Sequence, residues 1–397
     1  MNGWRSRILL PFLLTRGALL LVGLLACHRL VSGLTLQKGN LVYHQPGPPW
    51  LDLWARWDSE WYLLIAEQGY RSEPFFLGLP VNYREGDTTG FFPLYPLLIH
   101  AARYIGLSSL AAGVLISNLA LLAALACLFS LARRDLGEEE ASASVWALLA
   151  FPTSFFLSAV YAESLMLACL LGSILAARER RPWLAGGVGA LCVLSRPTGF
   201  LVLVPLFDEL VIRRWSESGR EELGHPGQGR RAWRSGLAAA RGLPPLTLPL
   251  VALGGYMVYC HALYGRYEEF LIRQSRWRGP TSGPWRAFVR FFESPGAQDV
   301  HHLKLDLIAA VLCVVSIPFL FRALRRSYAL YATAAILLPL GSTLWSFSRF
   351  AATIFPLHLL LGRALARSPR LFPAYLALAL PLLGVLMALY AAWWWAG

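Results

Sequence analysis

Residues 8–31 read ILLPFLLTRGALLLVGLLACHRLV, an apolar run that directly follows Arg5 and Arg7. A transmembrane helix needs about 20 mainly apolar residues, so this run is long enough to cross a bilayer. A positive N-terminus before an apolar stretch also resembles a signal peptide, but the run has no obvious small-residue cleavage site. We therefore expect residues 8–31 to be a retained first membrane span.

The composition extends this interpretation to all 397 residues. Hydrophobic residues make up 56% of the chain and charged residues only 15%, with a mean hydropathy of +0.49. Soluble domains carry about 25% charged residues, so a conventional soluble enzyme is excluded. We predict a single all-α polytopic membrane domain over residues 1–397, with about ten or eleven transmembrane helices. The candidate spans are residues 8–31, 108–132, 143–159, 161–177, 183–195, 198–212, 243–264, 305–321, 328–345, 350–366 and 371–395.

The net charge of +13 would suggest nucleic-acid binding in a soluble chain, but the basic residues lie in short segments between apolar runs. If the spans alternate, the arginine clusters all fall on one side, which the positive-inside rule makes cytoplasmic. We expect no nucleic-acid partner, a cytoplasmic N-terminus and a basic cytoplasmic loop over residues 213–242. The expected location is the plasma membrane, or the endoplasmic reticulum membrane if the protein is eukaryotic.

Two long loops fall on the opposite, extracytoplasmic side, over residues 32–107 and 265–304. Residues 32–90 carry four basic and seven acidic side chains, an unusual acidic excess in this chain. Pro93 and Pro96 begin the apolar segment 91–107, which favours an interfacial or re-entrant helix over a span. The second loop could close over a substrate, or it could be an interfacial helix without substrate contact.

Residues 54–70, WARWDSEWYLLIAEQGY, form the strongest local signal. Helical spacing predicts one amphipathic helix whose aromatic stripe lies at the membrane interface. Asp58 lies at the edge of this stripe and Glu60 points elsewhere, which argues against a paired-carboxylate couple. A carboxylate held against indole rings can act as a proton acceptor. If the helix were only an interfacial anchor, the same carboxylate would face water. The pattern alone favours neither alternative. The stripe comprises Trp54, Trp57, Trp61, Leu64, Ile65 and Gln68.

Three further charged residues, Glu163, Arg196 and Arg349, lie at the outer membrane edge. Charge this close to hydrocarbon is costly, so each is a candidate site residue, although a snorkelling helix-end residue is equally consistent with each alone. All three fall on the same side as Asp58. Such a set of residues suits a phosphate-bearing lipid substrate. Arginine guanidinium groups can bind a phosphodiester through two hydrogen bonds, and a carboxylate beside them can accept the proton of a hydroxyl group.

Other motif classes are missing from the sequence. It contains no Gly-rich phosphate loop, no nucleotide-binding fold, no His-x-x-x-His pair and no serine nucleophile elbow. The six cysteines lie in or beside apolar segments without a Cys-x-x-Cys pair, so we expect neither disulfides nor a zinc site. We expect no metal site and no cofactor, and a transferase without a nucleotide-binding fold would have to take an activated donor from elsewhere.

Several segments together resemble a known family. The pair RWDSEWYLLIAEQGY (56–70) and FFPLYPLL (91–98) is similar to the motif pair of the phosphatidylinositol-glycan class V (PIG-V) mannosyltransferases and their bacterial relatives. These belong to the GT-C superfamily of polyprenyl-phosphate-sugar-dependent glycosyltransferases. Three later segments resemble the same family: SAVYAESLMLA (158–168), LSRPTGF (194–200) and SFSRFAATIFPL (346–357). The chain has only two lysines, a bias typical of a high-GC bacterial coding sequence.

The resemblance implies a GT-C-like fold and a site. It places Asp58 as the catalytic base. It implies mannosyl transfer, with inversion, from a polyprenyl-phosphate donor to a lipid-anchored or glycan acceptor on the extracytoplasmic face. Membrane lipids, and an accessory membrane subunit in some assemblies, would be the partners. The implied substrate-binding residues are Glu60, Glu163, Arg196, Arg349, Trp57, Trp61, Tyr70 and Phe92.

Two rival functions remain open from the sequence. In a transporter or a lipid or glycolipid flippase, the same charged residues would line a translocation path. That reading predicts charge deep within spans and an internal repeat, and neither is evident here. A non-catalytic membrane scaffold is the third reading.

Overall fold

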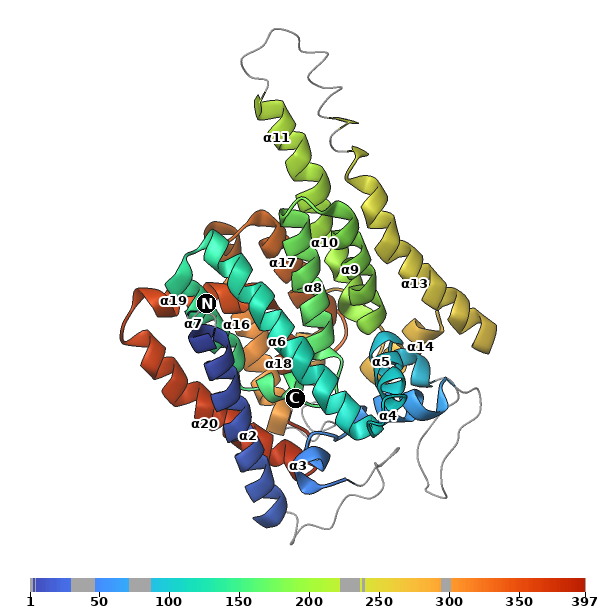
Figure 1. Ribbon diagram of the computed structural model, residues 1–397, viewed down its shortest axis with the longest axis vertical. Coiled ribbons are helices and arrows are strands. Elements are labelled where there is room, and N and C mark those ends of the chain that lie inside the picture. The colour runs from blue at the N-terminus through green and yellow to red at the C-terminus, as the bar shows by residue number, and fades with distance from the viewer. Residues whose placement is uncertain are drawn as a thin grey trace.

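Figure 1 shows the computed structural model of the chain, a bundle of helices. The structure describes residues 3, 5–29, 47–70, 87–221, 236, 237, 240–293 and 301–396. Throughout these ranges the regular elements are helices and no strand occurs, which confirms the predicted all-α architecture.

Five helical segments of the described chain are long and apolar enough to cross a membrane, so the protein is an integral membrane protein. They correspond to η1 with α2, and to α6, α13, α16 and α20. The bounds are η1 Arg5–Leu9, α2 Leu10–Arg29, α6 Ser109–Asp135, α13 Leu243–Tyr264, α16 His301–Ala323 and α20 Leu371–Ala391.

The remaining predicted spans are shorter or interrupted helices. The helix expected over 143–159 ends at Leu149 and gives way to a turn before the 3₁₀ segment η4, because Pro152 cannot continue it. The segment 198–212 is likewise a succession of three short helices. The bounds are α7 Glu138–Leu149, η4 Ser154–Leu157, α8 Glu163–Arg178, α9 Pro182–Ser195, η5 Pro197–Val202, α10 Leu203–Phe207, η6 Asp208–Ile212, α17 Arg326–Leu340 and α19 Phe355–Arg367.

Local sequence sets where the long helices begin and end. Ser108 caps α6, because its hydroxyl accepts a 3.2 Å hydrogen bond from the amide of Ala111. Helix α13 begins with prolines in its first turn and ends at Gly265, whose φ of 74° lies in the left-handed region that glycine adopts without strain.

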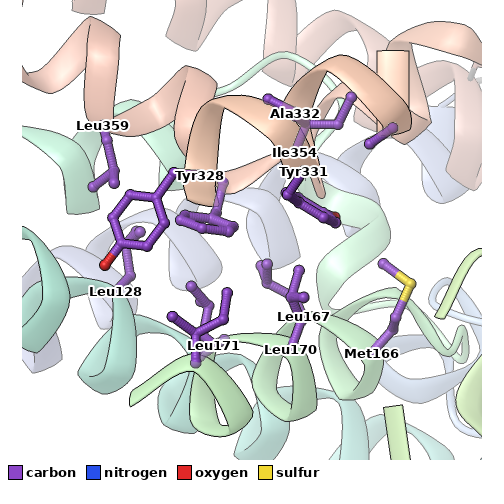
Figure 2. Packing of buried hydrophobic residues seen from close by; sticks show 14 of the residues in the cluster. Leu128, Met166, Leu167, Leu170, Leu171, Tyr328, Tyr331, Ala332, Ile354 and Leu359 are labelled. Atoms are coloured by element: carbon purple, nitrogen blue, oxygen red, sulfur yellow. The ribbon is translucent and has the colours of Figure 1, made fainter. Parts of the chain in front are cut away.

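The hydrophobic core lies between α6, α8, α17 and α19 (Figure 2). Leu167, Leu170 and Leu171 of α8 face Tyr328 and Tyr331 of α17, and these five side chains are buried. Between the helices of a membrane protein, close van der Waals packing of such side chains provides the attraction, because lipid tails are as apolar as leucine. This core holds the central helices at fixed spacing.

One end of the bundle carries a cluster of ion pairs. Asp135 at the end of α6 accepts a 2.7 Å hydrogen bond from Nη2 of Arg178 and a 3.0 Å bond from the hydroxyl of Tyr328. Glu209 of η6 accepts hydrogen bonds from Arg325 and, at 2.7 Å, from Ser327. These contacts tie α6, α8, η6 and α17 together. Two arginines from separate basic segments, Arg178 and Arg325, therefore meet at one end, whereas the cytoplasmic identity of that end stays a prediction.

The opposite end is built from short helices (Figure 1). Helix α5 contains ten residues, too short to span a bilayer, and its exposed Leu97 and Tyr104 agree with the predicted interfacial segment. Helix α11 extends from the other end of the molecule, within the predicted basic loop 213–242. The bounds are α3 Pro49–Asp52, α4 Asp58–Gln68, η3 Asp87–Gly90, α5 Leu94–Arg103, α11 Arg213–Glu221, α14 Glu269–Arg278, α15 Arg286–Glu293 and α18 Phe347–Ala351.

Candidate active site

A cavity of about 630 Å³ opens among the short helices. Its walls come from α4, α13, α14, α17 and α18, from the turn that opens η5, and from the segment after α20. Four charged residues line it: Asp58, Arg196, Arg278 and Arg349. Three of these four were predicted from the sequence, and the fold brings them together from positions far apart in the chain.

The charged residues form a continuous chain of ion pairs. Nη1 of Arg349 donates a 2.8 Å hydrogen bond to Oδ2 of Asp58, and Nε of Arg349 lies 3.2 Å from Oε1 of Glu163. The same glutamate oxygen pairs with Nη1 of Arg196. Glu163 is the first residue of α8, where the helix dipole favours a negative charge. Two arginines and two carboxylates thus share one buried network.

Phe350 lies at the centre of the arginines. The guanidinium carbons of Arg278, Arg349 and Arg196 lie 4.5, 5.5 and 5.9 Å from the centroid of its ring. Cations within about 6 Å of an aromatic face are attracted by the quadrupole of the ring. One phenyl ring therefore gathers three guanidinium groups at the cavity wall.

Sequence reasoning did not single out Arg278. Burial, followed by the positive charges of Arg349 and Arg196, lowers the pKa of the Arg278 guanidinium to about 9. Among the described residues no carboxylate lies within ion-pair distance of it. The available signal was a cluster of arginines in the predicted extracytoplasmic loop 265–304, where the positive-inside rule expects few.

The loop before α18 positions Arg349, and Asp306 of α16 positions this loop. The fully buried carboxylate of Asp306 accepts hydrogen bonds from the amides of Ser346 at 3.0 Å and Ser348 at 2.7 Å. Ser346 has a φ of 64°, a left-handed conformation that is unfavourable for a residue with a side chain. The carboxylate therefore stabilises the strained turn that presents Arg349. Asp306 also escaped the sequence analysis.

The predicted helix over 54–68 is wrong in its first turn, because α4 begins at Asp58. Trp57 has a φ of 57°, which breaks the helix immediately before the carboxylate. The preceding carbonyls serve other elements: that of Trp54 accepts from the amide of Val160 at 2.9 Å, and that of Arg56 accepts from the hydroxyl of Tyr161 at 3.0 Å. The backbone is thus committed to tertiary hydrogen bonds that helical periodicity does not reveal.

The predicted tryptophan stripe is also divided between two places. Trp54 packs in a core cluster with residues of α2 and α20. Trp61 faces the cavity, where it stacks on Phe91 at 5.5 Å between ring centroids, and Trp277 lies 5.5 Å from the same ring. These three rings form one aromatic wall of the cavity.

A second aromatic group lies beside the ion pairs. The ring of Trp57 packs edge-on against Trp395 at 5.6 Å and against Trp393 at 6.2 Å. Trp395 lies 6.2 Å from Trp345, and both of these line the cavity. Aromatic residues from three distant parts of the chain therefore enclose the Asp58–Arg349 pair, which limits its access to water.

The other predicted residues support the site without lining the cavity. Glu60, in the first turn of α4, is buried. The hydroxyl of Tyr70 donates to the carbonyl of Phe91. Phe92 is buried against Tyr256, with 4.5 Å between ring centroids. The last two contacts hold Phe91 and Phe92 in place just before α5.

The second predicted outer loop reaches the site. Gln274, Trp277 and Arg278 of α14 line the cavity. The side-chain amide of Gln274 donates a 3.1 Å hydrogen bond to the carbonyl of Gly90. A β-carbon on Gly90 would lie 2.5 Å from Trp277, so glycine permits this close packing. Of the two readings left open for loop 265–304, the contact with the cavity favours a role at the site.

The described residues contain no group of three or more His, Cys, Asp or Glu side chains arranged to hold a metal ion. Their six cysteines are free thiols.

Comparison with known proteins gives one family and one fold. Residues 49–200 match the family model described as mannosyltransferase (PIG-V). This stretch contains Asp58, Glu163 and Arg196, so the resemblance inferred from the motifs is confirmed there. Arg349 lies beyond the match. Among curated proteins, no sequence matches the chain.

Among solved structures, ArnT from Cupriavidus metallidurans, bound to undecaprenyl phosphate, is similar with a TM-score of 0.50 at 16% identity. The match covers 91% of this chain and 61% of ArnT. The oligosaccharyltransferase AglB from Archaeoglobus fulgidus, in complex with an inhibitory peptide and a dolichol-phosphate, gives a TM-score of 0.45 at 14% identity, covering 97% of this chain and 56% of AglB. The ArnT likeness confirms the predicted GT-C-like fold, and the chain spans about three fifths of the length of that relative.

Proposed function

We propose that the protein is an integral-membrane glycosyltransferase. It transfers mannose, or a related hexose, from a polyprenyl-phosphate-linked donor to a lipid-anchored or glycan acceptor on the extracytoplasmic face. The observation that carries the proposal is the cavity that holds Asp58 beside arginines in an aromatic enclosure. The mannosyltransferase family match over residues 49–200 supports the sugar, and the lipid phosphate bound to the ArnT of similar fold supports the donor class.

Asp58 is the proposed general base. Its side chain is 31% exposed, so an acceptor hydroxyl can reach it from the cavity. In the described part of the chain, one hydrogen bond to this carboxylate is present, from Arg349 to Oδ2. The other oxygen is available to take the acceptor proton as the hydroxyl oxygen attacks the anomeric carbon. General-base catalysis of this kind contributes about 10²–10⁴-fold to a rate.

Arg349 and Arg196 are proposed to stabilise the departing lipid phosphate. Guanidinium groups in a water-poor site interact with developing negative charge more strongly than in bulk water, and they are already oriented. Direct displacement of the phosphate inverts the anomeric centre. The aromatic wall of Trp61, Phe91 and Trp277 offers flat apolar surface for the sugar face.

The sugar arrives already activated by its phosphate link, so the proposal needs no separate cofactor and no metal. The polyprenyl tail of the donor stays in the bilayer, and membrane lipids surround the helices. The N-terminus and the ion-pair end of the bundle are proposed to face the cytoplasm, which follows from the arginine distribution. An accessory membrane subunit and a bacterial source remain predictions.

The test is sugar transfer by purified protein in detergent or liposomes, with mannosyl polyprenyl phosphate as donor and isolated membrane glycolipids as acceptors. Wild-type protein should form a glycosylated product, and Asp58→Asn should lower the rate by about 10³-fold. The matched control is Glu67→Gln on the same helix, whose carboxylate accepts a 2.6 Å hydrogen bond from Ser109 away from the cavity. Its rate should stay near wild type.

Two outcomes would contradict the proposal. If the Asp58→Asn variant transfers sugar as fast as wild type, Asp58 is not the general base. Movement of the lipid across liposomes without any covalent product would instead identify a transporter or flippase.

A further inference from the structure

In the proposed mechanism the guanidinium group of Arg349 has two functions. Arg349 must stabilise the leaving phosphate, yet its Nη1 is bonded at 2.8 Å to Oδ2 of Asp58, and its Nε lies 3.2 Å from Glu163. Its side chain is only 6% exposed, so it cannot swing out to solvent and back. Its positive charge is therefore shared between two carboxylates in the resting site, and a phosphate has to compete with them for it.

The charges around the cavity indicate at which step of the reaction the contact between Arg349 and Asp58 is exchanged. Arg196, Glu163, Arg349 and Asp58 form a balanced chain of two cations and two anions. Arg278 has no ion-pair partner among the described residues, and it lines the same cavity. The other nearby acid, Asp306, is turned toward two backbone amides. Arg278 is thus the guanidinium group of the cavity that has no carboxylate of the described chain in contact, which leaves its donors available to the single negative charge of a glycosyl phosphodiester.

Transfer alters this balance in one step. The acceptor hydroxyl oxygen bonds to the anomeric carbon, and the bond from that carbon to the phosphate oxygen breaks with its electron pair going to the phosphate. The lipid phosphate then carries two negative charges, while Asp58 takes the acceptor proton and becomes neutral. The total charge is unchanged, but Arg349 has lost one of its two anionic partners, and the phosphate has gained a negative charge.

Resting on the proposed function, we propose that Arg349 exchanges partners during transfer, from the carboxylate of Asp58 to the leaving phosphate. Arg278 holds the phosphate before and after the exchange. The position of all three guanidinium groups around the Phe350 ring supports this, because the phosphate bound at Arg278 is then adjacent to Arg349. Proton transfer to the base and stabilisation of the leaving group are coupled through one side chain.

Binding of undecaprenyl phosphate to the purified full chain tests the exchange without turnover. At about pH 8 this lipid is mainly a dianion, like the product. Asp58→Asn mimics the protonated base and removes one of the two counter-ions of Arg349. The variant should bind the lipid about tenfold more tightly than wild type. Arg278→Gln should bind about tenfold more weakly, whereas Arg276→Gln, an exposed arginine on the same helix, should match wild type.

A double-mutant cycle separates exchange from a general field effect, because removing any nearby negative charge would favour an anion somewhat. The gain from Asp58→Asn should disappear in an Arg349→Gln background and persist in an Arg278→Gln background. If Arg349→Gln does not fold, Arg349→Lys replaces it, since one ammonium cannot hold Glu163 and the phosphate together in the same geometry. The gain should then shrink.

The outcomes are distinct. An equal gain with and without Arg349, or no gain from Asp58→Asn, overturns the exchange even if the wild-type enzyme transfers sugar. Absence of sugar transfer by wild type overturns the proposed function, whatever the binding cycle gives.

Discussion

Arg349 and Asp58 lie 291 positions apart in the sequence, and a 2.8 Å hydrogen bond joins their side chains at the cavity wall. Each follows closely on a residue in the left-handed region, Ser346 before Arg349 and Trp57 before Asp58. Such backbone strain is maintained only where the surrounding structure compensates for it, and it concentrates at functional sites. The pair is thus held in place by the fold on both sides.

Arg349 uses two different nitrogens for two carboxylates, so its shape should matter as well as its charge. We expect Arg349→Lys to lower kcat of sugar transfer about 10²-fold, because an ammonium lacks the planar fork. Steady-state kinetics measures this, with Arg276→Lys as the control. A lysine variant with wild-type kcat would show that only the charge is needed.

Glu163 is 1% exposed and joins two arginines. Glu163→Gln leaves both buried cations without their shared counter-ion, and we expect it to lower the free energy of unfolding by about 3 kcal/mol. Thermal unfolding in detergent measures the loss. The exposed Glu139, paired with Arg7, provides the control, because Glu139→Gln should change stability by less than about 0.5 kcal/mol.

The close contact at Gly90 should set substrate affinity. A β-carbon there would meet Trp277 at 2.5 Å and push this ring out of the aromatic wall. We expect Gly90→Ala to raise the KM for the donor about tenfold. Gly254→Ala on α13 meets nothing within 4 Å and should leave the KM unchanged. Equal KM values for the two variants would exclude Trp277 from substrate recognition.

Asp306 should act through the loop that it holds. Asp306→Ala removes the acceptor of two buried amides, each costing about 1–3 kcal/mol when left unpaired. We expect faster hydrogen exchange at Ser346 and Ser348, and a lower kcat with little change in KM. The amide of Leu359, buried in the core on α19, is the internal reference. Unchanged exchange in the loop would assign Asp306 no positioning role.

The lowered pKa of Arg278, about 9, predicts a pH dependence of anion binding. An anion binds the charged guanidinium, so the affinity is full below about pH 9 and falls as pH rises through this value. Titration of undecaprenyl phosphate binding between about pH 8 and 10 should show the decline in wild type. Arg278→Gln should show a weaker affinity that is flat over the same range.

Much of the site could be predicted because charge near hydrocarbon is rare. Three charged residues could be singled out because a charge next to hydrocarbon is energetically unfavourable. Alternation of the spans then placed them on the same side of the membrane as Asp58: Glu163, Arg196 and Arg349. Arg278 could not be singled out in the same way, because the chain contains many arginines and an arginine in a loop carries little energetic penalty. Its burial arises only when α14 packs over the cavity.

The helix at residues 54–57 was mispredicted for a different reason. Periodicity reports which side chains could share a face, but it says nothing of where the carbonyls bond. The carbonyl of Trp54 accepts a hydrogen bond from the amide of Val160, and the carbonyl of Arg56 accepts one from the hydroxyl of Tyr161. These partners lie more than a hundred positions away, beyond any local pattern.

The ion-pair cluster around Asp135 and Glu209 has a mechanical consequence. It fastens the ends of α6, α8, η6 and α17 at the far end of the bundle from the cavity. Helix α8 is in fact held by ion pairs at both of its ends, at Glu163 beside the cavity and at Arg178 in this cluster. Its 16 residues therefore set the distance between the site and the far end of the bundle.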